Sequence, residues 1–584
     1  MSLVIVRRAH GDGADVLDPA LHPVLRRVYR ARGVERAEQL DLSMRRLLPV
    51  GTLGGVAAAA ELLLQHRARS VLVIGDFDAD GATSTALMLR ALRGWGFADV
   101  DFLVPNRFEY GYGLTPEIVA LAGARAPSLI VTVDNGISSV AGVAAARELG
   151  IEVLVTDHHL PGAGLPAAQV IVNPNVPGNG FASSALAGVG VAFYVMVALR
   201  RRLEQLGLLP PGAPAATDLL DLVALGTVAD VVPLDGNNRI LVAQGLARIQ
   251  AGRCAPGITA LLGIAKRTPA TITASDLGFA VAPRLNAAGR LTDMAIGIRC
   301  LLSADAAEAR ALAQQLDALN RERREIEARM QQEALAAVRV LRAATLEERR
   351  AGITLFHPSW HQGVVGLVAS RIKEALRRPV VAFAQVDEHT LRGSARSVAG
   401  VHIRDVFDSM AAHDPALMQK FGGHALAAGL SLARAKLDDF ARAFDREVRR
   451  VLADSASPDE LHTDGELSEA ELGLPTAEAL RAGGPWGAAF PEPLFDGVFE
   501  VQGARIVGER HLKLQVRAPE GRGSFDAIAF NCVDPAAPAP LPRGRIRLVY
   551  RLGTNDYQDV RRLQLVVEHL LPWEDGSLPA QAHT

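Results

Sequence analysis

The sequence has few cysteines and no long apolar run, and each absence excludes a class of protein. Its three cysteines, Cys254, Cys300 and Cys532, are far apart and form no CxxC pair, so we expect neither a disulfide framework nor a thiolate zinc site. The N-terminus MSLVIVRRAHGDG has no apolar stretch of signal-peptide length, and no segment approaches the roughly 20 apolar residues of a membrane span. These absences predict a soluble protein of the reducing cytoplasm.

A net charge of one sign is also absent. The 62 Lys and Arg residues nearly balance the 64 Asp and Glu residues, which leaves a formal charge of -2 at pH 7, so any site for a polyanion must be local. The 584 residues are 49% hydrophobic and 22% charged. This composition supports several packed cores, and we expect three or more domains.

Short apolar strands alternate with helices of small residues in the first half of the chain. The strands are expected at residues 71–75, 100–104, 129–133 and 152–156, with helices at 82–95 and 138–149. This cadence predicts a mainly parallel sheet with helices on both faces. Helical patterns continue at 184–206 and 216–250, and the charged segment 304–344 predicts a long connecting helix.

The second half of the chain predicts two further folded parts. An α/β pattern restarts near residue 352 and ends near residue 452, a linker follows at 454–460, and short alternating strands dominate beyond residue 497. The last pattern predicts a closed β-barrel of OB type. The predicted domains are an N-terminal extension (1–50), the parallel-sheet domain (51–265), an interdomain segment with the long helix (266–345), a smaller α/β domain (346–453) and the barrel domain (454–584).

The motif GDFDADG places Asp76, Asp78 and Asp80 after an apolar strand and before a helix expected from about Ala82. In a parallel sheet this loop lies at the carboxyl edge, where open α/β folds bind ligands, and three carboxylates suit a hard divalent cation. A helix cap with solvated neighbours is one alternative. An EF-hand loop is another, but its twelfth position would be Leu87 and a strand precedes it.

Two further strands end in polar residues of the same kind. VTVDNGIS carries Asp134, and VTDHHLPG carries Asp157, His158 and His159. A neutral imidazole beside carboxylates suits manganese, magnesium or zinc. A histidine pair alone is often a surface or capping feature, but the convergence of three strand ends favours metal ligands.

In LVALGTVADVVPL, Asp230 is the only ionisable residue of an apolar run. Burial of an unpaired carboxylate is costly, so we expect Asp230 to bind a metal, with a capping role or an arginine partner as the alternative. Four Asp-bearing motifs and one histidine would supply two metal ions with one bridging carboxylate. Such a pair activates water and neutralises charge at a phosphorus centre.

In this order, GDFDADG, VTVDNGIS, TDHH and LGTVADVVPL resemble the four motifs of DHH phosphoesterases. In the second domain, WHQGVVGLVASRI, RGSARS and FGGHALAAG resemble the DHH-associated domain, whose GGH loop faces the metal site and holds substrate. Together with APRLNAAGR and the barrel, these motifs extend the resemblance to RecJ-type exonucleases over nearly the whole chain. No catalytic position departs from the pattern.

The resemblance implies a site with two divalent metal ions, Mn²⁺ or Mg²⁺. The metal ligands would be Asp78, Asp80, Asp134, His158 and Asp230, with Asp134 as the bridge. Asp76 would be a further ligand or the partner of one. His159 would face the scissile phosphate as a hydrogen-bond donor or general acid, although the roles of the two histidines could be exchanged.

The resemblance also points to residues that bind substrate phosphates. They are Arg107, Arg284, Asn286, Arg290, Ser394, Arg396, Gly422, Gly423 and His424. Arginine forms bidentate phosphate contacts, and glycine lets the backbone approach closely. The alternatives are that Arg284 and Arg290 pair with acidic residues between domains and that GGH is an ordinary tight turn.

The barrel supplies the local positive charge that the whole chain lacks. Residues 501–565 contain 11 Lys and Arg against 6 Asp and Glu, a difference of +5, which suits a groove for a nucleic-acid strand. Phe525, Phe530, Tyr550 and Tyr557 could stack on bases. Aromatic residues in alternating strands are more often part of a core.

The resemblance implies a single-stranded-DNA-specific exonuclease that degrades DNA 5′→3′ to 5′-mononucleotides in recombination and repair. It further implies a monomer that works with a single-strand-binding protein and a RecQ-type helicase, and a passage between the α/β domains that excludes duplex. One alternative is a DHH-type oligonucleotide or cyclic-dinucleotide phosphodiesterase. Another is a non-catalytic single-strand nucleic-acid-binding scaffold, against which the intact ligand positions argue.

Overall fold

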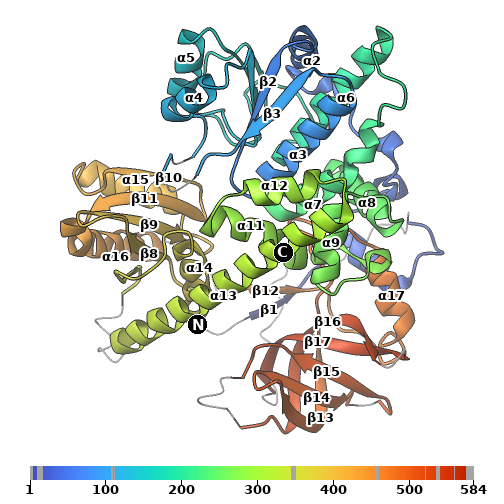
Figure 1. Ribbon diagram of the computed structural model, residues 1–584. Helices are drawn as coiled ribbons and strands as arrows, with labels where there is room; N and C mark the ends of the chain where they lie inside the picture. The colour runs from blue at the N-terminus through green and yellow to red at the C-terminus, as the bar shows by residue number, and fades with distance from the viewer. Residues whose placement is uncertain are drawn as a thin grey trace. The chain divides into compact units, whose positions relative to one another are not determined.

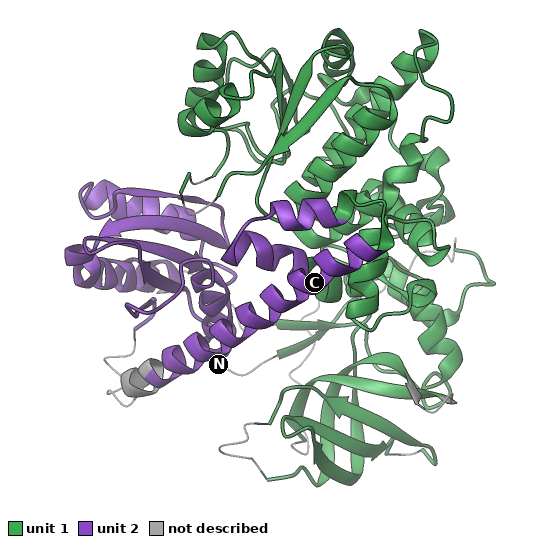
Figure 2. Cartoon of the chain, viewed as in Figure 1, with its two compact units in different colours: residues 1–282, 301–306, 459–584 green, residues 283–300, 307–458 purple. Residues whose placement is uncertain are grey.

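The computed structural model describes residues 4–9, 17–106, 109–110, 112–162, 164–342, 350–453, 460–519, 521–533, 540–557 and 560–573, without the side chains of 337–342, 453, 556–557 and 560. The chain divides into two compact units (Figure 2). Unit 1 comprises residues 1–282, 301–306 and 459–584, and unit 2 comprises 283–300 and 307–458. Each unit has its own sheet and core.

Unit 1 contains a five-stranded parallel sheet, of which strands β2 and β3 are labelled in Figure 1. Its strand order is β3 (Asp99–Leu103), β2 (Ser70–Gly75), β4 (Leu129–Val133), β5 (Glu152–Thr156) and β6 (Val170–Val172). All four strand pairs are parallel. The carboxyl ends of β2, β4 and β5 therefore lie side by side, as the sequence predicted.

Both faces of this sheet are covered, which explains why its strands are almost wholly apolar. Alternate residues such as Leu72, Ile74 and Ile130 pack with α4 (Pro116–Gly123) and α5 (Val140–Glu148). On the other side lie α2 (Val56–Gln65), α3 (Ala79–Gly94) and α6 (Gly188–Gln205). The central helix α3 is buried along nearly its whole length because α6 and α7 (Leu220–Asp230) pack against it.

Helix α7 ends at Asp230 and brings that residue to the carboxyl edge of the sheet. The next residue, Val231, has a left-handed backbone with φ of 63°, which stops the helix. Helix α8 (Gly236–Gln250) then begins at the N-cap Asp235 and packs against α7. Further helices of this region are α9 (Pro256–Ile264), the 3₁₀ turn η5 (Pro269–Thr271), α10 (Ala274–Asp276) and the π-helical turn η6 (Leu277–Val281).

Unit 1 also contains both ends of the chain. The N-terminal strand β1 (Val4–Arg7) pairs in parallel with β12 (Glu460–Thr463), and α1 (Pro23–Arg30) packs against α17 (Leu474–Ala482). Five strands then close the predicted barrel in the order β13 (Phe495–Val507), β14 (His511–Arg517), β15 (Ser524–Ala529), β17 (Val560–Pro572) and β16 (Gly544–Tyr557). The predicted all-β barrel is thus confirmed.

Unit 2 contains the long helix and a smaller mixed sheet. Its helices are α11 (Ala282–Leu291), α12 (Ala295–Leu302), α13 (Ala306–Arg342), α14 (Val365–Leu376), α15 (Ile403–His413) and α16 (Leu437–Ala453). The strand order is β10 (Lys420–Gly423), β11 (Ala427–Ala433), β9 (Thr390–Arg396), β8 (Val380–Gln385) and β7 (Ile353–Phe356). The predicted second α/β domain and connecting helix are both present.

Among the described residues, no single helix has the length and apolar character needed to cross a membrane. One bent pair, Met44–Thr52 with Val56–Gln65, meets the requirement only when its two parts are taken together. The predicted domain boundaries stay predictions. The two compact units are each made of several separate segments of the chain, so their limits do not test boundaries that follow the order of the sequence.

Candidate metal centre

The end of β2 supplies the first carboxylates of the site. Asp78 is the N-cap of α3, and its side chain accepts hydrogen bonds from the backbone N–H groups of Asp80 and Gly81, both at 3.0 Å. The helix therefore begins at Ala79, three residues before the predicted start at Ala82, and Asp80 lies in its first turn. The capping alternative and the predicted site involve the same residue.

Asp80 is almost fully buried, and helix α6 holds its carboxylate in place. The backbone N–H groups of Gly188 and Val189 donate to Asp80 Oδ2 and Oδ1 at 2.7 and 2.9 Å. These amides are at the N-terminus of α6, where the unpaired N–H groups of a helix favour an anion. No local sequence pattern predicts this support, because backbone amides can be placed only once the helix is positioned.

Asp134 follows β4 in a strained conformation at the centre of the cluster. Its φ is 62°, in the left-handed region that Asp adopts more readily than most residues. A Cβ atom at Gly188 would lie 2.6 Å from Asp134 Cβ and 2.7 Å from Asp134 Oδ1. The absence of a side chain at Gly188 thus allows α6 to approach the buried carboxylate.

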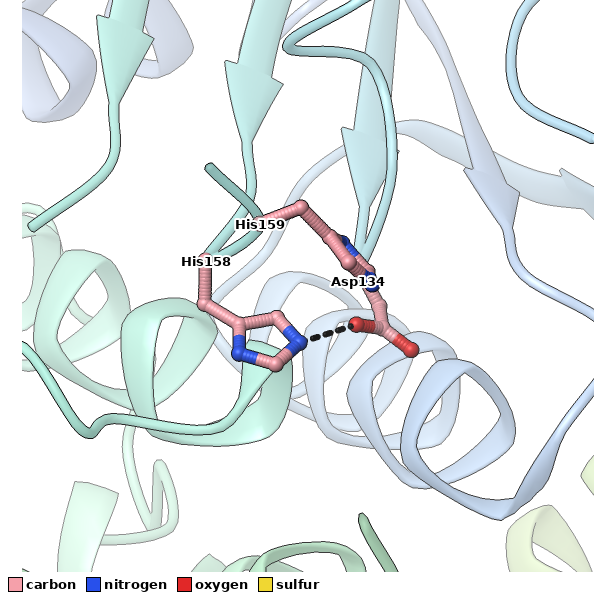
Figure 3. A group of neighbouring side chains, drawn as sticks. All are labelled: Asp134, His158 and His159. Atoms are coloured by element: carbon pink, nitrogen blue, oxygen red, sulfur yellow. Dashed lines mark ion pairs between the residues drawn. The ribbon is translucent and has the colours of Figure 1, made fainter. Parts of the chain in front are cut away.

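His158, which follows β5, points its ring toward Asp134 (Figure 3). Its Nε2 atom lies 3.1 Å from Asp134 Oδ1 and 3.5 Å from Asp230 Oδ2. Neither His158 Nε2 nor Asp134 Oδ1 has a hydrogen-bond partner, although both atoms are buried. Asn175 Nδ2 donates to the carbonyl of His158 at 2.6 Å and fixes the backbone behind the ring.

The structure brings all seven predicted catalytic residues together. Their ligand atoms form three overlapping groups in which every pair of atoms lies within 4.8 Å. The groups are Asp76, Asp78 and Asp134; Asp80, His158 and Asp230; and Asp134, His158 and His159. Asp134 and His158 each belong to two groups, and the bridging role of Asp134 stays a prediction.

The carboxylates of this cluster lie close together and repel one another, which changes their pKa values. Burial, together with repulsion from neighbouring carboxylates, raises the pKa of Asp80 and of Asp134 well above the usual range. Burial and the charge of Asp78 raise the pKa of Asp230 to about 7. Burial and the neighbouring His159 lower the pKa of His158 to about 4, so that its imidazole is neutral at pH 7. A divalent cation would relieve this repulsion.

His159 differs from His158 because it is paired with Asp157. Asp157 is buried and accepts hydrogen bonds from the backbone N–H groups of His158 and His159 at 2.7 and 3.1 Å, and His159 Nδ1 lies 2.7 Å from Asp157 Oδ1. Burial lowers the pKa of His159, but the hydrogen bond and the negative charge of Asp157 outweigh it and raise this pKa to about 9. The ring is therefore protonated at pH 7.

Two residues near His159 were missed as site residues. Asp157 orients both histidines, and the DHH motif itself contained that signal. The Tyr112 hydroxyl lies 3.1 Å from His159 Nδ1 and donates to the carbonyl of Asp134 at 3.3 Å. Tyr112 could have been found only from the position of its loop, since an isolated tyrosine in PNRFEYGYG carries no pattern.

The predicted phosphate-binding residues of α11 already make contacts inside unit 2. Arg284 Nε lies 2.9 Å from Asp317 Oδ1 on α13, and Arg290 Nη1 donates to the carbonyl of Gly363 at 3.3 Å. The acidic partner considered for Arg284 is thus present. Asn286 lies on the same helix, and Arg107 is outside the described residues. A phosphate role for these residues stays a prediction.

Ser394 and Arg396 form a small polar pair on β9. Arg396 Nη1 donates to Ser394 Oγ at 2.9 Å, and burial lowers the pKa of the Arg396 guanidinium. A Cβ atom at Gly366, near the N-terminus of α14, would lie 2.9 Å from Ser394 Oγ and from Arg396 Nη2. The pair therefore packs directly against the start of a helix.

The GGH motif forms the end of β10 and the turn into β11. Gly423 has φ of 145°, and the backbone N–H of His424 donates to the carbonyl of Ala427 at 2.8 Å. Gly422 pairs with Gly429 of β11. The motif is a tight turn, and its predicted contact with phosphate is not tested by this geometry.

The four aromatic residues of the barrel that were considered for base stacking differ in how far they are exposed. Tyr550 is fully buried and packs against Phe495 and Phe499, so the stacking prediction is wrong for Tyr550. Phe530 is half-exposed and lies beside His511. Phe525 is partly buried, and the side chain of Tyr557 is outside the described residues.

A parallel sheet with carboxylates and histidines at its carboxyl edge, a second α/β unit and a closed barrel together define a phosphoesterase of the DHH class. The model of the DHH family, N-terminal domain, matches residues 70–227, that of the DHHA1 domain matches 349–450, and that of the RecJ OB domain matches 463–569. The three matches follow the order of the folded parts.

Full-length relatives make this class more specific. The chain is 52% identical over 577 residues to the "Single-stranded-DNA-specific exonuclease RecJ" of Dickeya dadantii (98% of this chain, 100% of the relative). It is 51% identical over 572 residues to the protein of that name from Escherichia coli (97% and 99%). A crystal structure of RecJ with Mn²⁺ from Thermus thermophilus covers 95% of this chain and 76% of that chain at 34% identity, with a TM-score of 0.76. The chain belongs to the RecJ family.

Proposed function

We propose that the chain is a metal-dependent exonuclease that degrades single-stranded DNA from its 5′ end and releases 5′-mononucleotides in recombination and repair. The printed names of the relatives support the substrate and the activity. The observation that carries the proposal is the uncompensated cluster at the carboxyl edge, where Asp134 Oδ1 and His158 Nε2 are buried without hydrogen bonds. The polarity rests on the family resemblance.

The residues present fit two divalent cations, Mn²⁺ or Mg²⁺. The His158 Nε2 atom and the Asp134 Oδ1 atom face each other at 3.1 Å, and both are buried without a hydrogen-bond partner. Carboxylate oxygens with one imidazole are the ligands that Mn²⁺ accepts, and the raised pKa values of Asp80 and Asp134 are those of anions that lack a counter-ion. The Thermus thermophilus structures, determined with Mn²⁺ and with Mg²⁺, support the same ions.

The ligands would divide between two positions, with Asp134 as the proposed bridge. Asp76 and Asp78 would hold one ion with Asp134, and Asp80, His158 and Asp230 would hold the other with the same carboxylate. When bound, such a pair of ions activates a water molecule and neutralises charge on the phosphate. Asp157 and the amides of Gly188 and Val189 keep these ligands in place.

His159 would act on the substrate as a proton donor. Its pKa of about 9 keeps the ring protonated at neutral pH, and Asp157 fixes the ring through Nδ1. The Nε2 proton would then donate to a phosphate oxygen or to the leaving oxygen. In this proposal His158 is the ligand and His159 is the donor, which is one of the two arrangements that the sequence left open.

Ser394, Arg396 and the GGH turn would bind substrate phosphates in unit 2. Arg396 packs against the start of α14, so an arginine and a helix N-terminus are available to one anion. In unit 1, the barrel supports a polymeric substrate over a dinucleotide. On the strength of the family resemblance, we also propose a cytoplasmic location and a monomeric state. The proposed partners are a single-strand-binding protein and a RecQ-type helicase.

The test is digestion of an oligonucleotide labelled at its 5′ or 3′ end, with and without Mn²⁺. We expect early release of the 5′ label by the unmodified chain. Asp134→Asn keeps the shape and backbone preference of the residue but removes its charge, and we expect more than about 10²-fold loss of hydrolysis with strand binding retained. Glu152→Gln at the opposite edge of the sheet is the matched control and should retain activity. Retained hydrolysis in Asp134→Asn would refute the site, and early release of the 3′ label would refute the polarity.

A further inference from the structure

The loop that follows the proposed ligand Asp230 is anchored by a part of unit 1 that is distant in the sequence. Val231 and Pro233 of this loop are exposed, and Leu234 is its first buried residue. The backbone N–H of Leu234 donates to the carbonyl of Ala488 at 2.7 Å. The bond joins the loop to the segment that connects α17 with the first barrel strand, β13.

Ala488 lies in a tight turn of residues 487–490, named here the 487–490 turn. Gly487 and Phe490 form an antiparallel bridge across it, with N-to-O distances of 2.9 and 3.2 Å. A Cβ atom at Gly487 would lie 2.7 Å from Leu234 Cδ1 and 3.0 Å from Leu234 Cγ. The absence of a side chain at Gly487 therefore lets the turn approach the buried leucine closely.

Aromatic and arginine side chains hold the 487–490 turn in place. The Phe490 ring stacks on Trp486, with 5.2 Å between the ring centroids and 10° between the planes. The guanidinium carbon of Arg239 lies 3.9 Å from the Phe490 ring centroid. Arg239 is buried in the first turn of α8, the helix into which the loop leads. The turn is thus fixed against both ends of the segment that it anchors.

The loop is also joined to the segment before α6. Asn238 Nδ2 donates to the carbonyl of Ala185 at 2.6 Å and to the carbonyl of Pro233 at 2.9 Å. The chain continues from Ala185 into α6, whose first two amides hold the carboxylate of Asp80. Asp80 and Asp230 belong to the same ligand group, so connected supports hold both.

We propose that the 487–490 turn positions Asp230 for the ion that Asp230 would bind together with Asp80. The inference rests on the proposed function, because Asp230 is a ligand only if the carboxyl edge binds metal. The turn fixes Leu234 at one end of a short loop, and Asp230 is the residue at the other end. Partners that orient a ligand in this way contribute to metal affinity although they do not touch the ion.

The conformation of the loop gives the turn a reason to matter. Val231 has φ of 63°, and a β-branched residue keeps such a backbone only where its surroundings impose it. The Val231 side chain is 68% exposed, so its own packing does not supply that constraint. Asp78 is instead held as the N-cap of α3. A displaced turn should therefore disturb the position of Asp230 and leave that of Asp78 unchanged.

The first test is Gly487→Ala in the full chain, with Mn²⁺ binding measured by calorimetry in the absence of DNA. The new Cβ atom overlaps the buried Leu234 side chain, so the turn and the loop must separate. We expect the affinity for one of the two ions to fall about ten-fold and that for the other to stay the same. The unchanged ion also reports that the variant is folded.

Two further variants separate positioning from general packing. Leu234→Ala in the background of Gly487→Ala removes the overlapping atoms but keeps the backbone hydrogen bond, and it should restore the normal affinity. Gly263→Ala in α9, where nothing lies within 4 Å of the added atom, should change neither affinity.

The coupling should also act in the reverse direction, because linkage between two sites is reciprocal. Saturating Mn²⁺ should slow hydrogen exchange of the Leu234 amide in the unmodified chain, and this slowing should be lost in Gly487→Ala. Mass spectrometry of the peptide that contains Leu234 measures the exchange without any turnover of DNA.

Three outcomes would overturn the positioning role while leaving the proposed function intact. They are unchanged affinity for both ions in Gly487→Ala, an equal loss for both ions, and exchange of the Leu234 amide that does not respond to Mn²⁺. If the unmodified chain neither binds Mn²⁺ nor degrades a single strand with it, the proposed function itself fails, and the two failures are thus distinguished.

Discussion

The two edges of the parallel sheet each bury a histidine, but only one edge completes its hydrogen bonds. At the amino edge, His66 at the end of α2 lies 2.7 Å from Ser128 Oγ and 2.6 Å from Glu152 Oε2. At the carboxyl edge, His158 Nε2 has no hydrogen bond although Asp134 Oδ1 is 3.1 Å away. The same sheet therefore contains one satisfied and one unsatisfied imidazole.

This difference separates polar groups that support the fold from polar groups that serve chemistry. The amino edge pairs one carboxylate with one imidazole. The carboxyl edge gathers Asp78, Asp80, Asp134 and Asp230 around one neutral ring, and the pKa of Asp230 rises to about 7 as a result of burial and of the charge of Asp78. Stability alone would not select such a cluster, whereas a pair of cations explains it.

Among substitutions that leave every proposed ligand in place, the largest effect should come from a methyl group added at the carboxyl edge. In Gly188→Ala the new Cβ atom would overlap Asp134 Cβ at 2.6 Å, so the carboxylate must move. A displacement of about 1 Å in a catalytic group costs roughly 10²-fold in rate, and we expect a loss of that size in kcat/KM.

The matched substitution is Gly263→Ala in α9, where nothing lies within 4 Å of the added atom. This control should keep full activity and gain slightly in stability. Normal activity of Gly188→Ala would show that Asp134 does not need its observed position.

At the amino edge of the sheet, a substitution should lower stability and leave activity unchanged. His66→Ala leaves Ser128 and Glu152 without their buried partner, and we expect the free energy of unfolding to fall by about 2 kcal/mol with kcat unchanged. Thermal unfolding and steady-state kinetics measure the two quantities. His158→Ala should show the reverse, with activity lost and stability kept, and an equal response of both variants would remove the distinction between the edges.

Metal binding should stabilise the protein more at pH 8 than at pH 5. The pKa of Asp230 rises from its ordinary 3.8 to about 7 on folding, so the stability that its protonated form contributes is full below pH 3.8 and is lost as the pH rises through 7. Asp80 and Asp134 shift in the same direction. His159, whose pKa is raised from 6.5 to about 9, keeps its full contribution below pH 6.5 and loses it as the pH rises through 9.

We therefore expect the gain in unfolding free energy from saturating Mn²⁺ to be larger at pH 8 by roughly 1–2 kcal/mol. Thermal unfolding with Mn²⁺ or with a chelator, at both pH values, measures the gain. In Asp134→Asn the gain should shrink at both values. A gain that is independent of pH would contradict the interpretation of the cluster as uncompensated charge.

The sequence predicted that these residues lie close together because parallel strands fix where their ends lie. Asp78, Asp134 and His158 follow β2, β4 and β5, which are neighbours in register, and the strand pattern alone was enough to bring them together. The start of α3 was placed three residues late, since Asp78 was considered as a metal ligand and also acts as the helix cap. The backbone amides that hold Asp80 depend on the packing of α6, which no local pattern specifies.

The aromatic residues of the barrel show why other parts could not be predicted. Alternation says that Phe530 and Tyr550 lie on faces of strands but does not say which face is inside. Tyr550 of β16 pairs with Phe495 of β13, and its side chain lies in the core of the barrel. Phe530 lies just beyond the end of β15 and is half-exposed. Register and closure of a barrel decide this, and both involve residues far apart in the chain.

The smallest effect is expected for Glu152→Gln, which tests whether the amino edge depends on charge or on hydrogen bonding. Glu152 lies 2.6 Å from His66 Nε2, but its side chain is 40% exposed, so solvent screens the pair. The amide oxygen of glutamine can accept the same hydrogen bond, and we expect a loss of less than about 1 kcal/mol with unchanged hydrolysis. Raised salt should reduce even this difference, because screening weakens an ion pair more than a neutral hydrogen bond. A loss as large as that of His66→Ala would mean that the amino edge, too, is governed by an ionised pair, and the contrast with the carboxyl edge would then rest on the number of charges and not on their kind.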